Sequence, residues 1–181
     1  MTMWRTARAI STRSRARWPP RRSEGAPMSI HEQIELLRRF PAELAALVEH
    51  LTPEQLGTPY LAGEWTVAQN VHHLADAHMH AYLRCKFAVT QENPTVKPFD
   101  QDAWAAQPDA AELDITPSMA LLRGLHVRMT SFFASLPDEA WQRPFYHPER
   151  GPMVVSDMLA SVAAHCVAHT DQITRTLAAA K

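Results

Sequence analysis

The chain has 181 residues, which is enough for one domain with a sizeable buried core. Its five glycines argue against a loop-rich all-β fold, and no apolar run approaches the roughly 20 residues of a membrane span. Charge is divided unevenly, because residues 1–27 hold seven Arg and one Glu, which leaves 11 basic and 18 acidic residues for the rest. An acidic body is a poor candidate for nucleic-acid binding, so we expect neither a nucleic-acid nor a membrane partner.

Residues 1–27 lack apolar periodicity and are predicted to form a disordered Arg-rich tail. No apolar segment follows the Arg21–Arg22 pair, so we expect no export signal and a cytoplasmic protein. Two interpretations of the tail stay open: a basic arm for an acidic partner, or translation that starts at Met28, where the composition changes. The folded domain is expected to span residues 28–181.

Apolar residues at helical spacing predict four helices of about 20 residues each. We expect them at about residues 29–50, 66–90, 116–136 and 156–177. Thr66, Thr116 and Ser156 are the expected N-caps of the last three. Pro41 is expected to bend or restart the first helix.

The connections between these helices carry few strand signals. Residues 52–55 and 137–141 predict short helical turns, and residues 145–152 predict a loop with a short hairpin. The 91–115 connection contains three prolines, and its Phe99 and Trp104 give it side chains to bury, so we expect it to pack across the bundle. The fold class is therefore expected to be all-α, a four-helix bundle of up-down helices with a long loop between the second and third.

Two histidines in the last helix predict a polar site at the edge of the core. His165 and His169 are four residues apart, so their side chains lie on one face of the helix, at the margin of its apolar stripe. Two imidazoles so placed can share one divalent metal. A hydrogen-bond network is the alternative, since buried polar groups need partners. The spacing alone leaves both open.

A third ligand would have to come from another helix, because three histidines with an open position are a common arrangement for catalytic zinc. The second helix offers His72, His73, His78 and His80. Helical geometry does not choose between His72 and His73. His78 lies among apolar residues, and we interpret it as a core histidine, as we do His126 in the third helix.

Several motifs resemble those of one known family in the same order along the chain. They are Trp65-Thr66-Val67, His72-His73-Leu74-Ala75-Asp76, Glu92-Asn93-Pro94-Thr95, Ala103-Trp104, Phe145-Tyr146-His147-Pro148 and His165-x-x-x-His169. Over about residues 30–178 the chain resembles the DinB/YfiT-like proteins, in particular the YfiT branch of metal-dependent hydrolases. The resemblance implies a four-helix bundle, a homodimer, and one zinc or nickel ion per chain held by His73, His165 and His169.

Three functions follow from such a site. The first is a hydrolase in which the metal activates water on a small substrate. The second is a thiol S-transferase that uses a diffusible low-molecular-weight thiol such as bacillithiol, because Cys85 and Cys166 are not placed as nucleophiles and are expected to be reduced, structural thiols. The third is a non-enzymatic metal-binding or stress-response module.

Three further polar residues of the second helix have two interpretations each. Asp76 follows His73 by three residues. It could orient a metal-binding histidine ring through a hydrogen bond, or it could pair with a cation at the surface. His72 and His80 could shuttle protons or simply be exposed. We assign no general base from the sequence.

Overall fold

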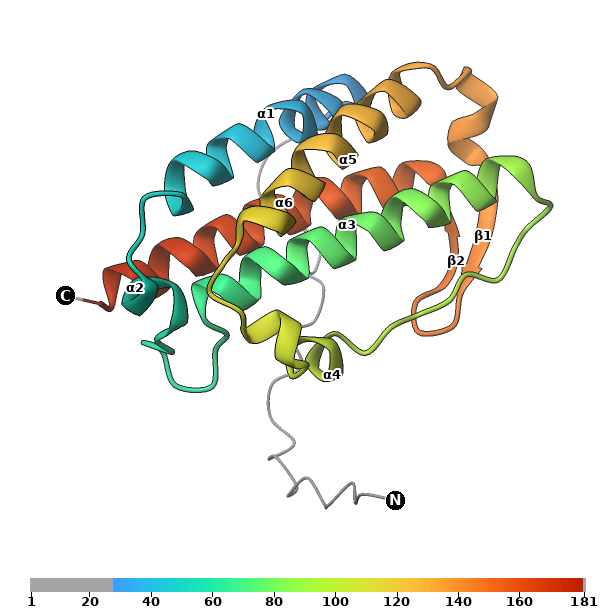
Figure 1. Cartoon of the computed structure of the whole chain (residues 1–181). Helices are drawn as coiled ribbons and strands as arrows, with labels where there is room; N and C mark the ends of the chain where they lie inside the picture. Colours follow the sequence, from blue (N-terminus) through green and yellow to red (C-terminus); the bar gives the residue numbers. More distant parts are fainter. Residues whose placement is uncertain (1–27, 181) are drawn as a thin grey trace, which may run out of the picture.

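The computed structural model describes residues 28–180 as four long helices with shorter elements between them (Figure 1). The Arg-rich segment 1–27 lies outside the described residues. The long helices are α1 (Ile30–Val48), α3 (Val67–Thr90), α5 (Thr116–Ala134) and α6 (Val155–Ala178). The short elements are α2 (Pro53–Gly57), α4 (Gln101–Ala105), the 3₁₀ turns η1 (Pro108–Ala111) and η2 (Asp138–Gln142), and the strands β1 (Pro144–His147) and β2 (Gly151–Val154). The four predicted helices and both short helical turns are confirmed.

The start of α3 is set by the capping box of Thr66 and Gln69. The Thr66 hydroxyl accepts the Gln69 N–H at 3.2 Å, and the Gln69 side chain accepts the Thr66 N–H at 3.0 Å. These bonds satisfy main-chain donors that a helix N-terminus otherwise leaves unpaired. The N-cap predicted at Thr66 is therefore confirmed.

The caps predicted at Thr116 and Ser156 are wrong, because both residues lie inside their helices. In each case a nearby carboxylate supplies the missing acceptor: Asp114 Oδ1 accepts the Thr116 N–H at 3.0 Å, and Asp157 Oδ2 accepts the Val154 N–H at 3.1 Å. Pro41 lies within α1, which continues through it as one helix, so the helix does not restart there.

The bundle core is formed by a square of helices in which α1 and α3 each pack against both α5 and α6. Helices α1 and α3 are therefore diagonal to one another, as are α5 and α6 (Figure 1). Large apolar side chains from all four helices are fully buried between them, among them Phe40, Leu74, Met129 and Leu159. This burial is the main force that holds the helices together.

The expected up-down order of the helices is wrong in one step, because α3 and α5 run in the same direction (Figure 1). The connection between them returns along α3 to the end at which that helix began, and only then does α5 start. Gln69 fastens this connection by donating from Nε2 to the Ala105 carbonyl at 2.9 Å. The connection thus packs along α3 and forms part of the surroundings of the α3 side chains.

The hairpin predicted near residues 145–152 is confirmed as the antiparallel pair β1–β2. Gly151 opens β2 with φ of +78°, a left-handed conformation that glycine adopts without strain. The connection joins the same small sheet, because the Val96 N–H donates to the Tyr146 carbonyl and the Tyr146 N–H donates to the Pro94 carbonyl, each at 2.9 Å. The hairpin therefore anchors the first part of the connection beside α3.

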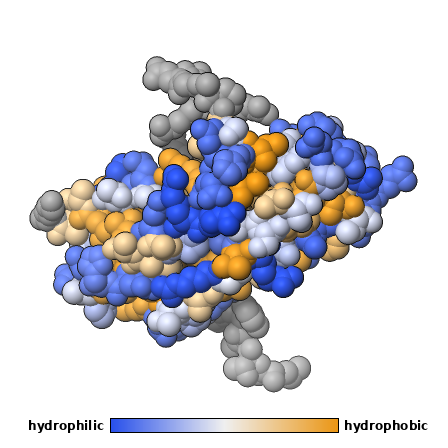
Figure 2. Space-filling view, turned by 90° about the horizontal axis from the view of Figure 1, so that it is seen from above, coloured by the Kyte–Doolittle hydropathy of each residue, from blue (hydrophilic) through white to orange (hydrophobic). Residues whose placement is uncertain are grey.

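The outer face seen from above, over α1 and α5, carries intermixed hydrophilic and hydrophobic residues (Figure 2). Val127 on α5 is 67% exposed, and it stands among polar neighbours on that helix. Within the described residues, no helix combines the length and the apolar character that crossing a membrane requires.

Candidate metal centre

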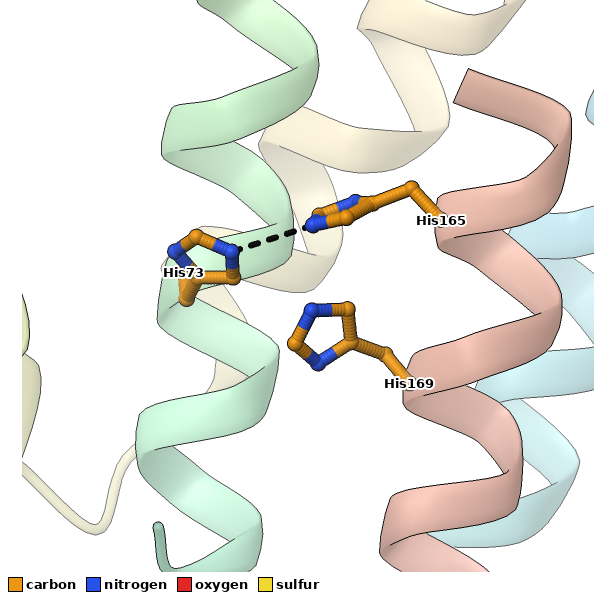
Figure 3. Close-up of side chains that lie close together, drawn as sticks. All are labelled: His73, His165 and His169. Atoms are coloured by element: carbon orange, nitrogen blue, oxygen red, sulfur yellow. Dashed lines mark hydrogen bonds between the residues drawn. The ribbon is translucent and has the colours of Figure 1, made fainter. Parts of the chain in front are cut away.

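Three histidines converge from two facing helices near the middle of the bundle (Figure 3). His73 extends from α3, and His165 and His169 extend from successive turns of α6. Each offers one ring nitrogen, and these three atoms lie within 4.8 Å of one another. The residues are only 4%, 3% and 8% exposed, respectively. The arrangement satisfies the first requirement for a shared metal, which is that several donors face one point.

The spacing of these nitrogens fits a small divalent cation. The Nε2 atoms of His73 and His165 are 3.1 Å apart. Two nitrogens that each lie about 2.0–2.1 Å from a tetrahedral zinc are separated by about 3.3 Å. The same separation also accommodates one hydrogen bond between the rings. The donor set of three imidazoles is one that zinc and nickel accept readily.

The protonation of the three rings also suits metal binding, which requires neutral imidazole. Burial, and secondly the charge of a protonated His169, lower the pKa of His73 to about 3. Burial lowers the pKa of His169 to about 4. Burial, followed by the neighbouring histidines, holds the pKa of His165 well below its usual range. All three rings are therefore neutral at neutral pH, which is the state in which an imidazole can bind a metal.

Asn70 determines which nitrogen of His169 faces the site. Its amide Nδ2 donates to the Thr66 carbonyl at 2.9 Å, which orients Oδ1 toward His169. Oδ1 lies 2.7 Å from His169 Nδ1, and because an amide oxygen only accepts, Nδ1 carries the proton. The lone pair of the neutral His169 ring is then on Nε2. Asn70 has no role in the expectations drawn from the sequence, where its position about one helical turn before His73 is the available signal.

The two histidines interpreted as core residues are confirmed as such. His78 and His126 are 0% and 1% exposed, and both ring nitrogens of each have a polar partner. His78 Nε2 lies 3.2 Å from Nδ1 of His165, so this core pair touches the candidate metal centre from the side opposite the converging nitrogens.

Aromatic side chains surround the converging rings. Trp65 meets the His73 ring edge-on at a centroid distance of 4.7 Å and stacks on His169 at 6.2 Å. Phe99, from the connection, lies 6.3 Å from the His73 ring and stacks on His80 at 4.5 Å. Trp104 packs against both Phe99 and His80. The connection thus places apolar surface next to the site, which favours exclusion of bulk water.

Helical geometry left His72 and His73 open, and the structure brings His73 to the two histidines of α6. His72 points toward the connection, where Nδ1 lies 2.7 Å from Ser118 Oγ and Nε2 lies 2.9 Å from the Glu112 carbonyl. It is 8% exposed, so its interpretation as an exposed residue is wrong: the connection covers it. His73, one residue later, is the one that meets His165.

Asp76 is half-buried, and its titratable neighbours are Asp109 and His72. Burial, and secondly Asp109, raise the pKa of its carboxyl group, while His72 opposes the rise. The hydrogen-bond partners of the three converging rings include Asn70 and His78. Asn70 contacts the His169 ring directly, which is the orienting role that the sequence offers as one possibility for Asp76.

Both cysteines are buried and chemically protected. Burial raises the pKa of the Cys85 thiol to about 12 and that of Cys166 well above its usual range. Each thiol is therefore un-ionised at neutral pH, and the thiolate is the reactive form. The expectation that the cysteines are structural thiols agrees with this burial.

The fold and this cluster define a four-helix-bundle protein with a candidate metal centre between two antiparallel helices, and comparisons with known proteins give the family. The model of the DinB superfamily matches residues 36–173, so the chain belongs to the DinB superfamily. It is 39% identical to the Bacillus subtilis protein named "Putative metal-dependent hydrolase YfiT" over 78% of this chain and 82% of that protein. It is 44% identical to the Geobacillus kaustophilus "Putative metal-dependent hydrolase GK0616" over 80% and 82% of the two chains.

Solved structures agree with the fold. The structure of YfiT from Bacillus subtilis, described as "a probable metal-dependent hydrolase with an unusual four-helix bundle topology", matches with a TM-score of 0.80 at 37% identity, covering 87% of this chain and 91% of that one. A mycothiol-dependent maleylpyruvate isomerase matches with a TM-score of 0.54 at 17% identity, which shows a shared fold alone. The resemblance found in the sequence motifs is confirmed.

Proposed function

We propose that this protein is a metal-dependent hydrolase of the YfiT type, in which His73, His165 and His169 hold one zinc or nickel ion and activate water on a small substrate. The observation that carries the proposal is the convergence of three buried, neutral imidazoles within 4.8 Å. Its relatives named as metal-dependent hydrolases support the reaction class.

Three protein ligands leave one position of a tetrahedral site for water or substrate. A zinc ion there lowers the pKa of bound water to about 7, which is the chemistry that it would supply. The residues of the chain do the remaining work: His165 and His169 are held on one rigid helix, and Asn70 keeps Nε2 of His169 directed at the site. Trp65 and Phe99 present apolar surface beside His73, where a small substrate would lie.

Transfer of a thiol is the competing reaction for the same open position, because a divalent cation also stabilises a thiolate. The burial of Cys85 and Cys166 means that such a thiol would have to come from solution as a low-molecular-weight cofactor. A binding or stress-response module would hold the metal and show neither reaction.

The test starts with elemental analysis of the full chain purified without a His-tag, followed by assays of ester, amide and electrophile substrates with and without an added thiol. We expect about one zinc or nickel per chain and hydrolysis that needs no thiol. Turnover only in the presence of thiol would replace hydrolysis with S-transfer. One metal without turnover in any assay would favour the binding module, and absence of metal after reconstitution would overturn the metal site itself.

The homodimer implied by the family resemblance also stays a proposal. Sedimentation equilibrium of the full chain checks it directly, since a dimer has twice the 20.4 kDa mass of one chain. A mass of one chain at micromolar concentration would contradict it.

A further inference from the structure

A chain of buried histidines leads away from the candidate metal centre and ends on the main chain of α1. His165 Nδ1 lies 3.2 Å from His78 Nε2, and His78 Nδ1 lies 2.8 Å from His126 Nε2. The last contact, 2.6 Å long, joins His126 Nδ1 to the Leu37 carbonyl oxygen. The chain takes one member from each long helix of the bundle, in the order α6, α3, α5, α1.

The direction of every hydrogen bond in this chain follows from its last member. A carbonyl oxygen only accepts, so His126 donates from Nδ1 to Leu37. A neutral ring has one proton, so His126 Nε2 accepts, and the bond must come from His78 Nδ1–H. By the same reasoning His78 Nε2 accepts from His165 Nδ1–H, which leaves the lone pair of His165 on Nε2.

The rings must be neutral for this reasoning to hold, and their surroundings ensure it. His78, His126 and His165 are 0%, 1% and 3% exposed, and a buried charge without a counter-ion is costly. Phe40, which is 2% exposed, stacks on His126 at 5.5 Å and tilts against His78 at 5.8 Å. Its ring fills the space beside the pair and limits rotation of both imidazoles.

We infer that His78 and His126 are positioning residues that hold His165 in the tautomer whose Nε2 lone pair faces the metal centre. The inference rests on the proposed metal site. Asn70 alone orients His169, because its amide nitrogen donates to the Thr66 carbonyl and its amide oxygen accepts from His169 Nδ1–H. Both α6 ligands are thus oriented by hydrogen bonds that end on main-chain carbonyl oxygens, in α1 for His165 and at the start of α3 for His169.

The chain sets a tautomer and does not conduct protons. Its end, the Leu37 carbonyl, has no proton to give and passes none on, and all three rings are buried. Metal affinity is therefore expected to depend on His126, a residue of α5 that is two hydrogen bonds away from His165. Outer contacts of this kind typically change metal affinity 10–100-fold when they are removed.

The test compares two substitutions at one position in the full chain. In His126→Gln, the amide nitrogen can donate to the Leu37 carbonyl and the amide oxygen can accept from His78, so every hydrogen bond keeps its direction. His126→Leu can do neither. We expect His126→Leu to weaken zinc binding about 10–100-fold, measured by competition with a chromophoric chelator, and His126→Gln to stay within a few-fold of wild type. His72→Gln is the matched control, because His72 is also a buried, hydrogen-bonded histidine but does not belong to the row of hydrogen-bonded histidines. This variant should leave the zinc affinity unchanged.

A second measurement needs no variant and no metal. ¹⁵N NMR of the imidazole rings in metal-free wild-type protein should show His165 and His78 as single tautomers with the proton on Nδ1, a signature that a merely space-filling role would not require. A proton on Nε2 of His165, or a mixture of tautomers, would overturn the inference. So would equal zinc affinity in wild type, His126→Gln and His126→Leu, and that result would leave the proposed function standing. Wild-type protein that binds no zinc would instead refute the proposed function, while NMR would still decide the tautomer.

Discussion

Asn70 and His169 form a short side-chain hydrogen bond beside the candidate metal centre, with 2.7 Å between the amide Oδ1 and the ring Nδ1. The amide cannot rotate to offer its nitrogen instead, because Nδ2 is engaged by the Thr66 carbonyl at 2.9 Å. The N-cap residue of α3 thus helps to determine the tautomer of a candidate metal ligand on α6. A single side chain links the start of one helix to the candidate site on another.

Replacing Asn70 should therefore weaken metal binding without removing a ligand. Asn70→Leu takes away the acceptor for His169 Nδ1–H, so we expect a 10–100-fold loss of zinc affinity in a chelator competition. Asn70→Asp keeps an acceptor, of a kind that often orients metal-bound histidine, and should retain most of the affinity. Equal losses in both variants would contradict a role in orientation.

The assignment of the third ligand predicts opposite results for two neighbouring histidines. His73→Ala should abolish stoichiometric metal, whereas His72→Ala should keep the metal and lose stability, because it leaves Ser118 and the Glu112 carbonyl without their partner. The stability loss should be about 1–3 kcal/mol, because the substitution removes two hydrogen bonds that each contribute about 0.5–1.5 kcal/mol net. Elemental analysis and urea unfolding of the two variants check these results. Metal lost in His72→Ala and kept in His73→Ala would reverse the assignment.

The two cysteines should be unreactive toward thiol reagents in the folded protein. Because both thiols are buried and their pKa values are raised, a thiol reagent such as DTNB should label neither at pH 8, and both should react once the chain is unfolded in urea. Cys85→Ser and Cys166→Ser should keep any thiol-dependent turnover. Rapid labelling of a native cysteine, or loss of turnover in one folded variant, would mean that the chain supplies its own thiol.

His147 on β1 predicts a pH dependence of stability. Burial, and next Arg84 and Arg150, lower the pKa of this 4% exposed histidine to about 4, whereas an unfolded histidine titrates near 6.5. Between these values the unfolded state binds a proton that the folded state does not. Stability is therefore lost as the pH falls from about 6.5 to about 4, by up to about 1.4 kcal/mol per pH unit for one such group, and is unaffected above that window.

The measurement is urea unfolding of wild type and His147→Gln at pH 7.5, 6.0 and 5.0. The slope of unfolding free energy against pH should be smaller in the variant, by the contribution of about one proton. The other buried histidines also make the unfolding free energy depend on pH, so some slope remains in both proteins. Identical slopes would show that His147 does not remain neutral in the folded state.

Much of the fold could be predicted from the sequence, since local signals determine helices. Apolar spacing located all four long helices, and Thr66 with its downstream Gln69 is a capping box that can be recognised by eye. The direction of α5 could not be predicted, because it depends on the path of the 91–115 connection, which is set by contacts such as Gln69 with the Ala105 carbonyl. Ser156 looked like a cap, but the helix starts one residue earlier, where Asp157 reaches back to Val154.

The candidate site was predictable in part for the same reason. The spacing of His165 and His169 lies within one helix and could be interpreted directly, whereas His73 is separated from His165 by 92 positions. Neighbouring residues on a helix point about 100° apart, so only the packing of α3 against α6, or a family motif, distinguishes His73 from His72. The roles of Asn70, His78 and His126 depend on hydrogen bonds between helices, and the spacing of residues along the sequence does not predict such bonds.

The parallel course of α3 and α5 also affects how the chain can fold. Among the four long helices, α1 is followed by α3 and α5 is followed by α6, and each of these two pairs is diagonal in the bundle. The remaining consecutive pair, α3 and α5, packs side by side but is joined by the long 91–115 segment. No two consecutive long helices can therefore pair early across a short turn. Contacts that close over long sequence separations slow folding, so this bundle should fold more slowly than a simple helical meander of its size. During synthesis on the ribosome, His73 can contact His165 only after the last helix has emerged.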